Sequence, residues 1–296
     1  GFSSVEILIV DDGSSDDTAN VAWQNRADQV LRLERHIGLA QAYTKGLDEA
    51  LKMGADVIVN TDADNQYPGS EIAKLVEPIV LDEAEMVIGD RGVGTLEHFS
   101  PTKRLLQKLG SKVVSTTAGF KIPDATSGFR AITREVALQT LVLSNYSYTL
   151  ETLIQAGVKK VKVAFVPVRT NAPTRPSRLF RSVRNYVVNS TKTIIRSFTM
   201  YRALKVFTWF SVILIGLGLA LGIRFLYFYF QGMGGGHIQS LILTAILLII
   251  GFFTFLIGLL ADLVSFNRKI LEEILYRLRR QDADGPDESD WSHLDF

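Results

Sequence analysis

The sequence Val57-Ile-Val-Asn-Thr-Asp-Ala-Asp-Asn-Gln-Tyr-Pro68 joins a short apolar run to two carboxylates one residue apart. The β-branched residues at its start predict a strand that is buried on both faces of a sheet. Open α/β sheets bind ligands where their strands end, so Asp62 and Asp64 are predicted to lie at that rim. With the amide of Gln66 they form a set of hard oxygen ligands that suits Mg²⁺ or Mn²⁺. A solvated turn is the alternative interpretation, because Asp, Asn and Pro are common turn formers.

Further short apolar runs predict more strands, and helical patterns lie between most of them. Strands are predicted at residues 5–10, 30–33, 86–89 and 161–168, and helices at 40–51, 71–81, 102–117 and 148–156. This alternation predicts an α/β fold with a mostly parallel sheet flanked by helices.

A second acidic cluster follows the first predicted strand. The sequence Asp11-Asp12-Gly13-Ser14 lies there, and Ser and Asp residues just beyond it predict the start of a helix. Asp12 would stand at the carboxyl end of the strand, where it could accept hydrogen bonds from a nucleobase or a ribose. Arg35 follows the next strand and would lie over the same rim, although a single Arg is most often a surface charge.

Two more segments place Arg residues after predicted strands or loops. Arg91 follows the strand at 86–89. The sequence Pro123-Asp-Ala-Thr-Ser-Gly-Phe-Arg-Ala131 predicts a loop that runs into a short strand. Gly128 in this loop permits an unusual backbone angle, and Arg130 would supply a planar fork that binds anions.

The net charge of +1 conceals a strong asymmetry along the chain. Residues 1–174 carry 18 Lys+Arg and 22 Asp+Glu, a balance of −4, whereas residues 175–205 carry eight basic residues and no acid. A basic block of this kind binds polyanions or lies on an anionic membrane. The chain has no cysteine, which excludes disulfides, thiolate metal sites and a cysteine nucleophile.

Two long apolar runs decide between these interpretations of the basic block. Residues 206–230 and 238–266 are almost entirely apolar, and each exceeds the roughly 20 residues that span a bilayer core. They predict two transmembrane helices and make a nucleic-acid partner unlikely for the basic block. The connection at 231–237 has no Lys or Arg, whereas basic residues follow the second run. By the positive-inside rule, both long ends of the chain are therefore predicted to be cytoplasmic.

We therefore expect four regions. These are an α/β domain at 1–174, a basic amphipathic segment at the membrane interface at 175–205, two transmembrane helices at 206–267, and a cytoplasmic tail at 268–296. The tail from residue 281 onward holds six acids and no Lys or Arg, a composition that predicts disorder.

Four motifs, in order and ahead of a membrane anchor, carry a resemblance to a known family. They are Ile9-Val-Asp-Asp-Gly-Ser-Ser-Asp-Asp-Thr18, Thr61-Asp-Ala-Asp-Asn-Gln-Tyr-Pro68, Gly89-Asp-Arg91 and Thr126-Ser-Gly-Phe-Arg-Ala131. From residue 4 to about residue 205, the chain resembles the family 2 glycosyltransferases of GT-A (Rossmann-like) fold. Within that family it is most similar to the dolichol-phosphate mannosyltransferases and polyprenyl-phosphate glycosyltransferases.

The resemblance, with the residues named above, predicts a complete site. The nucleotide-sugar would be held by Val10, Asp11, Asp12, Arg35, Asp62, Ala63, Asp64, Arg169 and Arg178. The metal, Mg²⁺ or Mn²⁺, would be bound by Asp62, Asp64 and Gln66. The residues predicted to act in catalysis are Asp64, Arg91, Arg104 and Arg130. The match at Arg169 and Arg178 is loose, because the loop that carries them is longer here than in the mannosyltransferases.

One part of the family pattern is missing from this sequence. The family begins with a strand that bears a Pro-x-Tyr-Asn-Glu motif, and this sequence starts after that point. We expect the sequence to be an N-terminally incomplete fragment. If the strand were truly missing, part of the nucleotide pocket would be missing too, and activity would be in doubt.

The leading hypothesis is an inverting transfer of a hexose from a UDP- or GDP-sugar to a polyprenyl or dolichyl phosphate at the cytoplasmic membrane face. A lipid phosphate is already an anionic nucleophile and needs no general base. A second hypothesis is transfer to a hydroxyl of a glycan or a lipid-linked saccharide, with Glu151 or Asp124 as the base. A third is a catalytically inactive membrane scaffold.

Overall fold

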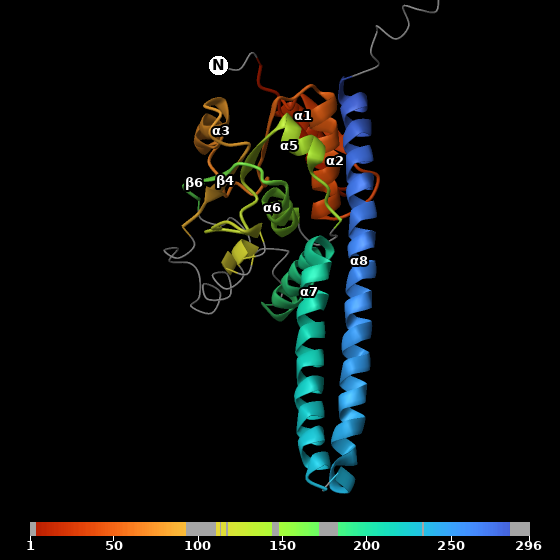
Figure 1. Ribbon diagram of the computed structural model, residues 1–296. Coiled ribbons are helices and arrows are strands. Elements are labelled where there is room, and N and C mark those ends of the chain that lie inside the picture. Colours follow the sequence, from red (N-terminus) through yellow and green to blue (C-terminus); the bar gives the residue numbers. More distant parts are fainter. Residues whose placement is uncertain are drawn as a thin grey trace, which may run out of the picture. The chain divides into compact units, whose positions relative to one another are not determined.

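The computed structural model of the chain is drawn in Figure 1. It describes residues 4–92, 111–112, 114–116, 118–143, 148–171, 183–232 and 234–284, with the backbone but not the side chains at 183–203. The chain forms two compact units, residues 1–195 with 272–296 and residues 196–271. The first unit contains the strands, and the second contains most of two long helices.

The first unit holds two sheets. In the smaller one, β1 (Leu8–Asp11) and β2 (Gln29–Arg32) pair in parallel. The larger one has the order β3-β5-β4-β6, made of β3 (Val57–Asn60), β5 (Arg130–Thr133), β4 (Met86–Asp90) and β6 (Val163–Pro167). The predicted strands are all present, within a few residues of the expected bounds.

Helices accompany both sheets, so the predicted α/β fold is confirmed (Figure 1). They are α1 (Thr18–Gln24), α2 (Leu39–Lys52), the short 3₁₀ turn η1 (Gly69–Glu71), α3 (Ile72–Val80), α5 (Arg134–Gln139) and α6 (Tyr148–Lys159). Both α1 and α2 pack on the smaller sheet, and α3 packs on β3, β4 and β5. The predicted helix at 102–117 is described from residue 111, where the chain is helical.

The prediction of a mostly parallel sheet is wrong for the larger sheet. Strand β5 lies between β3 and β4 and runs antiparallel to both, whereas β4 and β6 are parallel. The reason lies in the loop before β5: the carbonyl oxygen of Phe129 accepts a hydrogen bond from the N–H of Gly89, near the end of β4. The chain therefore enters β5 at the edge where β3 and β4 end, and it must run back across the sheet.

An apolar core fixes this edge of the sheet. Its buried members are Tyr67, Leu75, Ala84, Val87, Phe129, Ala131 and Val168. The rings of Tyr67 and Phe129 stack with centroids 4.7 Å apart, an arrangement that aromatic pairs favour. Since Tyr67 follows the Asp-x-Asp turn and Phe129 precedes β5, this contact holds two loops of the site together.

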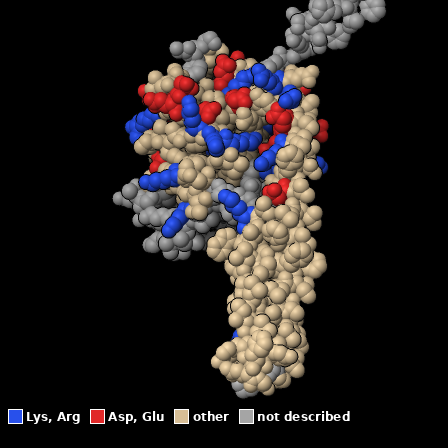
Figure 2. Space-filling view, viewed as in Figure 1, with Lys and Arg blue, Asp and Glu red and all other residues tan. Residues whose placement is uncertain are grey.

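The second unit holds the greater part of two long helices. Helix α7 spans Val183–Phe230 and α8 spans Ile238–Asp284, joined by the 3₁₀ turn η2 (Gly234–His237). Both contain stretches that are long and apolar enough to cross a membrane. Large apolar side chains such as Trp209 and Phe253 are exposed, and Figure 2 shows an almost uncharged surface over these helices. An apolar surface of this size is unfavourable in water and favourable in the hydrocarbon core of a membrane.

Helices α7 and α8 extend beyond the two predicted apolar runs. The expected border at residue 205 lies inside α7, whose helix is continuous from residue 183. At the other end, α8 remains helical to Asp284, so the prediction of disorder from residue 281 is wrong for 281–284. Residues 285–296 lie outside the described part of the chain.

Tertiary contacts explain why the end of α8 is ordered. Residues from Glu272 onward belong to the first unit. The guanidinium of Arg279 lies 3.0 Å from a carboxylate oxygen of Asp48 and donates a hydrogen bond to the carbonyl oxygen of Thr140. The hydroxyl of Tyr276 donates to Glu135 over 3.2 Å, and Lys159 pairs with Glu272 at 3.6 Å. These contacts offset the conformational entropy that the end of α8 loses when it becomes ordered.

The contacts of Arg279 predict a measurable loss of stability. We expect Arg279→Ala to destabilise the first unit by about 1–3 kcal/mol, because the side chain is 12% exposed and its removal leaves two acceptors without their donor. Thermal unfolding in detergent, followed by Trp fluorescence, measures the effect. Arg277→Ala is the matched control, since its pair with Glu273 is an exposed i,i+4 pair of little worth. Equal melting temperatures for the two variants would contradict the assignment.

Candidate active site

The Asp-x-Asp stretch forms a turn directly after β3. Asp62 and Asp64 are partly buried, and Ala63 between them is exposed. The Oδ1 atom of Asp64 accepts a hydrogen bond of 3.0 Å from the N–H of Gln66. Asn65 has φ +59°, a left-handed conformation that Asn tolerates better than most residues. The stretch is therefore a turn, and it lies at the edge of the sheet where β3 ends. Its backbone agrees with both interpretations given above, the solvated turn and the ligand site.

The surroundings of Asp62 make its carboxylate unlike that of an ordinary solvated turn. Burial raises the pKa of the Asp62 carboxyl, the charge of Asp64 raises it further, and the guanidinium groups of Arg91 and Arg130 oppose the shift. Two carboxylates that repel each other in a partly buried place are stabilised by a divalent cation. In the described part of the chain no group of three or more acids or His is placed to hold a metal. Carboxylate and amide oxygens are hard donors, the kind that Mg²⁺ and Mn²⁺ accept together with waters or phosphate oxygens.

Arg91 is held next to this acidic pair by Asp124. Its Nε donates to Oδ2 of Asp124 over 2.7 Å, and its Nη2 donates to Oδ1 over 2.9 Å and to the hydroxyl of Thr126 over 2.7 Å. Burial by itself would raise the pKa of Asp124, but the charge and hydrogen bonds of Arg91 outweigh it and hold that pKa below its usual range. The pair fixes the guanidinium in one orientation near Asp62.

Arg130 has a different environment from the one that the sequence predicts. Its side chain is buried, with 1% of the residue exposed. It donates hydrogen bonds to the carbonyl oxygens of Ser127 and Thr149 and to the hydroxyl of Thr152. Because these bonds occupy its donors within the core, the geometry favours a structural role for Arg130 over the predicted catalytic one.

Sequence reasoning missed the residues that bring Asp62 and the 123–131 loop together. The amide of Asn60 donates to the carbonyl oxygen of Gly128 and to the hydroxyl of Tyr148, each over 2.8 Å. A Cβ atom on Gly128 would lie 2.9 Å from that hydroxyl and 3.0 Å from Oδ2 of Asp62. Gly128 is therefore required by space. Asn60 was visible in the motif, but nothing in the sequence indicated its partners.

The two acids after β1 have separate tasks. Both oxygens of Asp12 accept hydrogen bonds from the backbone N–H groups of Ile37 and Gly38, over 2.8 and 3.0 Å, and His36 lies 2.7 Å away. Asp12 therefore fixes the start of α2. The Oδ1 of Asp11 accepts from the N–H of Ser14, whereas its buried Oδ2 has no hydrogen bond among the described residues and lies 3.8 Å from Nε of Arg32.

Of the other predicted site residues, Val10 and Arg35 pack against glycines, and two more lie outside the described part of the chain. The side chain of Val10 is directed at Gly46 of α2, where an added Cβ would meet it at 2.9 Å. The backbone of Arg35 packs so closely on Gly13 that a Cβ there would lie 2.5 Å from the Arg35 carbonyl carbon. Gly13 also has φ +68°, so this contact requires glycine. Arg104 and Arg178 lie outside the described residues.

Arg169 leaves β6 beside the loop that follows the Asp-x-Asp turn. Its Nε donates to Glu71 over 2.9 Å, and its backbone N–H donates to the same carboxylate over 3.2 Å. Lys74 also donates to Glu71, over 2.6 Å. Hydrogen bonds from Lys74 and Arg169 lower the pKa of Glu71 to about 2. The structure thus brings Arg169 to the loop that follows Asp62 and Asp64, through an acid that sequence reasoning did not consider.

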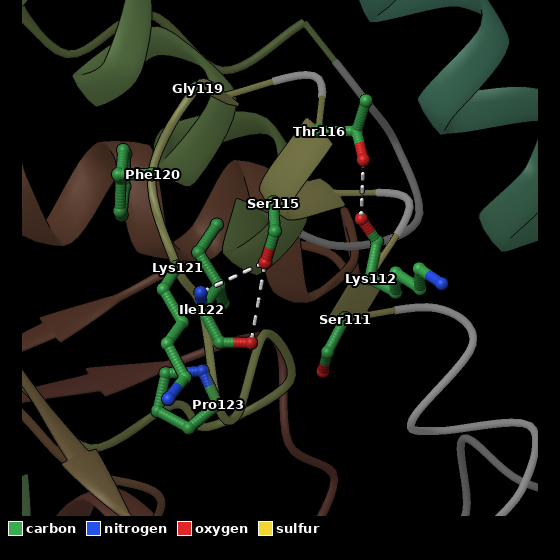
Figure 3. A pocket seen from close by; sticks show the side chains of 9 residues that line it. All are labelled: Ser111, Lys112, Ser115, Thr116, Gly119, Phe120, Lys121, Ile122 and Pro123. Atoms are coloured by element: carbon green, nitrogen blue, oxygen red, sulfur yellow. Dashed lines mark hydrogen bonds between the residues drawn. The ribbon is translucent and has the colours of Figure 1, made fainter.

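An open cavity of about 670 Å³ lies in the first unit, and Figure 3 shows the residues that line it. The hydroxyl of Ser115 accepts a hydrogen bond from the N–H of Ile122 over 2.8 Å. The ammonium groups of Lys112 and Lys121 lie on different sides of the view and do not converge (Figure 3). The cavity contains none of the predicted site residues.

The close approach of Gly128 to Asp62 predicts the effect of one added methyl group. We expect Gly128→Ala to weaken Mn²⁺ binding by about tenfold or more, since overpacking costs about 1–3 kcal/mol and displaces the carboxylate. Calorimetric titration measures binding, and circular dichroism checks the fold. Gly69→Ala is the matched control, because no atom lies within 4 Å of the added Cβ. Unchanged binding in Gly128→Ala would contradict the coupling of Gly128 to the Asp62 carboxylate.

The lowered pKa of Glu71 predicts a pH dependence of stability. An acid whose pKa is lower in the folded state stabilises the fold above its unfolded pKa and loses that contribution as it becomes protonated. The first unit should therefore lose stability as the pH falls from about 4.5 toward about 2. Glu71→Gln should show a smaller loss over the same range, measured by melting temperature against pH. The exposed Glu83, changed to Gln, should leave the profile as in the parent protein.

Comparison with known proteins agrees with this geometry. The family model described as glycosyl transferase family 2 matches residues 2–140. The UDP-N-acetylglucosamine–dolichyl-phosphate N-acetylglucosaminyltransferase of Methanococcus voltae is 31% identical over 185 residues, which cover 55% of this chain and 74% of that protein. The polyprenol monophosphomannose synthase of Mycolicibacterium smegmatis is 32% identical over 176 residues, which cover 55% of this chain and 66% of that protein.

The fold also has a counterpart among solved structures. The crystal structure of mannosyl-3-phosphoglycerate synthase from Rubrobacter xylanophilus matches with a TM-score of 0.50 and 18% identity, over 65% of this chain and 62% of that one. Identity this low speaks for the fold only. Taken with the family match and the sequence relatives, the chain is a glycosyltransferase that belongs to family 2 and has the GT-A fold.

Proposed function

We propose that this glycosyltransferase transfers a hexose from a UDP- or GDP-sugar to a polyprenyl or dolichyl phosphate, with inversion, at the cytoplasmic face of a membrane. The observation that carries the proposal is the partly buried pair of acids, Asp62 and Asp64, beside the fixed guanidinium of Arg91. Opposite charges arranged in this way suit a diphosphate that is bridged by a divalent ion.

The chemistry requires little covalent help from the chain. The leaving nucleoside diphosphate gains negative charge in the transition state, and Mg²⁺ or Mn²⁺ bound by Asp62, Asp64 and Gln66 would stabilise that charge. Arg91 would also stabilise that negative charge. Asp124 orients its guanidinium but accepts hydrogen bonds from only some of its five N–H groups. Charge stabilisation by groups that are already in place is the most effective form of such catalysis.

The nucleoside end of the donor would be recognised at the end of β1. The buried Oδ2 of Asp11 accepts no hydrogen bond from the described residues and lies 3.8 Å from Nε of Arg32, and a buried acceptor without a hydrogen bond costs free energy. A base N–H or a ribose hydroxyl would supply the missing donor. Asp12 would act indirectly, because its oxygens already hold the start of α2.

Three observations support a lipid phosphate as the acceptor. Both relatives described above are named for a dolichyl phosphate or for a polyprenol monophosphate product. A hydroxyl acceptor would need a base, but Asp124 is paired with Arg91, and the carboxylate of the buried Glu151 accepts a bond from the N–H of Leu143. The two apolar helices support a site close to lipid. A lipid phosphate needs no base, so these residues suit it better than a sugar hydroxyl.

The proposal predicts which lipid becomes labelled and which acids are required. Purified protein is incubated with radiolabelled UDP-glucose, GDP-mannose and related donors, Mn²⁺, and undecaprenyl or dolichyl phosphate. We expect label in one of the lipid phosphates, and a loss of at least about 100-fold in Asp62→Asn and Asp64→Asn, as for removal of strong transition-state electrostatics. Asp82→Asn, at an exposed turn, is the control. Label in a saccharide but in neither lipid would overturn the proposal.

A further inference from the structure

The segment that leaves β6 is bonded to the Asp-x-Asp turn at two consecutive carbonyl groups. The backbone N–H of Asn171 donates to the carbonyl oxygen of Gln66 over 2.9 Å. Its side-chain amide donates to the carbonyl oxygen of Asn65, also over 2.9 Å. These residues are more than 100 positions apart in the sequence, so the contact is made by the tertiary fold.

The two bonded carbonyls belong to the turn that carries the predicted metal ligands. Inside the turn, the Asp64 carboxylate accepts from the N–H of Gln66 over 3.0 Å. Asn65, between them, has φ +59°, a conformation that persists when surrounding contacts determine it. Asn171 supplies such contacts from outside the turn. It therefore acts on the backbone that directs the side chains of Asp64 and Gln66.

A second contact holds the other end of the same loop. The carboxylate of Glu71 accepts from both the backbone N–H and the Nε of Arg169, over 3.2 and 2.9 Å. Lys74 donates to it over 2.6 Å. Residues 65–71 are thus bonded to residues 169–171 at both ends of the loop, with Asn171 at the turn and Glu71 at the start of α3.

We propose that Asn171, with the support of Glu71, is a positioning residue for the divalent ion: it holds the turn at Asn65 and Gln66 so that Asp64 and Gln66 face the ion before it binds. The inference rests on the proposed function, in which these side chains hold the ion and the donor diphosphate. Its physical basis is preorganisation, since a ligand set that is ordered beforehand does not lose that freedom on binding.

The test is Mn²⁺ binding to the full chain in detergent, followed by the electron paramagnetic resonance signal of free Mn²⁺, without nucleotide and with UDP or GDP. We expect Asn171→Ala to raise the Kd of Mn²⁺ by about 3- to 10-fold, the usual effect of one lost hydrogen bond. Asn171→Leu, which keeps the size but has no donor, should give the same rise. Lys162→Ala, at the opposite end of β6, should bind as the parent protein does.

Kinetics separate positioning from a general loss of structure. In Asn171→Ala the concentration of Mn²⁺ needed for half-maximal transfer should rise by the same factor, and saturating Mn²⁺ should restore kcat. The melting temperature should stay within a few degrees of the parent value, since Asn171 is exposed. A lower kcat at saturating Mn²⁺ with an unchanged requirement for the ion would overturn the inference.

The outcomes also separate this inference from the proposed function. If the variant binds Mn²⁺ more weakly while neither protein labels a lipid phosphate, the acceptor assignment is wrong and the role of Asn171 stands. If parent and variant bind Mn²⁺ equally, the role of Asn171 is wrong, whatever lipid is labelled.

Discussion

The reversal of the chain at β5 is the constraint on which the candidate site depends. The loop before β5 is bonded to the end of β4 through Gly89 and Phe129, so β5 has to run back between β3 and β4. This places Gly128 beside Asp62, with Asn60 and Tyr148 on the other side. A site at the edge of a sheet is thereby built from residues of three strands and of α6.

The charges at that edge of the sheet determine what it can bind. The carboxyl of Asp62 is partly buried next to Asp64, and the fold supplies guanidinium groups nearby that are each bonded to other partners. Arg91 is oriented by an acid, whereas Arg130 is enclosed by neutral oxygens of the core. The two guanidinium groups reduce the negative potential at Asp62 and Asp64 but do not cancel it. This arrangement favours a cation that binds together with an anionic donor.

Much of the architecture could be predicted because hydrophobic runs and turn residues act locally. The strands, most helices, the two apolar helices and the turn at Asp62 and Asp64 were all predicted from such patterns. Errors arose where a distant contact outweighed the local pattern. The end of α8 was predicted to be disordered from its acids, but Arg279 bonds to Asp48 and Thr140. Arg130 was predicted to bind anions, but residues of α6 enclose it.

The sequence by itself determined that this is an α/β chain with acids after two strands and two apolar helices, because side-chain periodicity and strand ends follow from local chemistry. The tertiary structure decided that Asp12 is bonded to the start of α2, which Arg is buried, and which distant residues hold the Asp-x-Asp turn. Those properties depend on hydrogen bonds between segments up to 106 residues apart, as for Asn171 and Asn65. Such bonds leave no periodic signal in the sequence, since any polar residue that the fold brings within about 3 Å can make them.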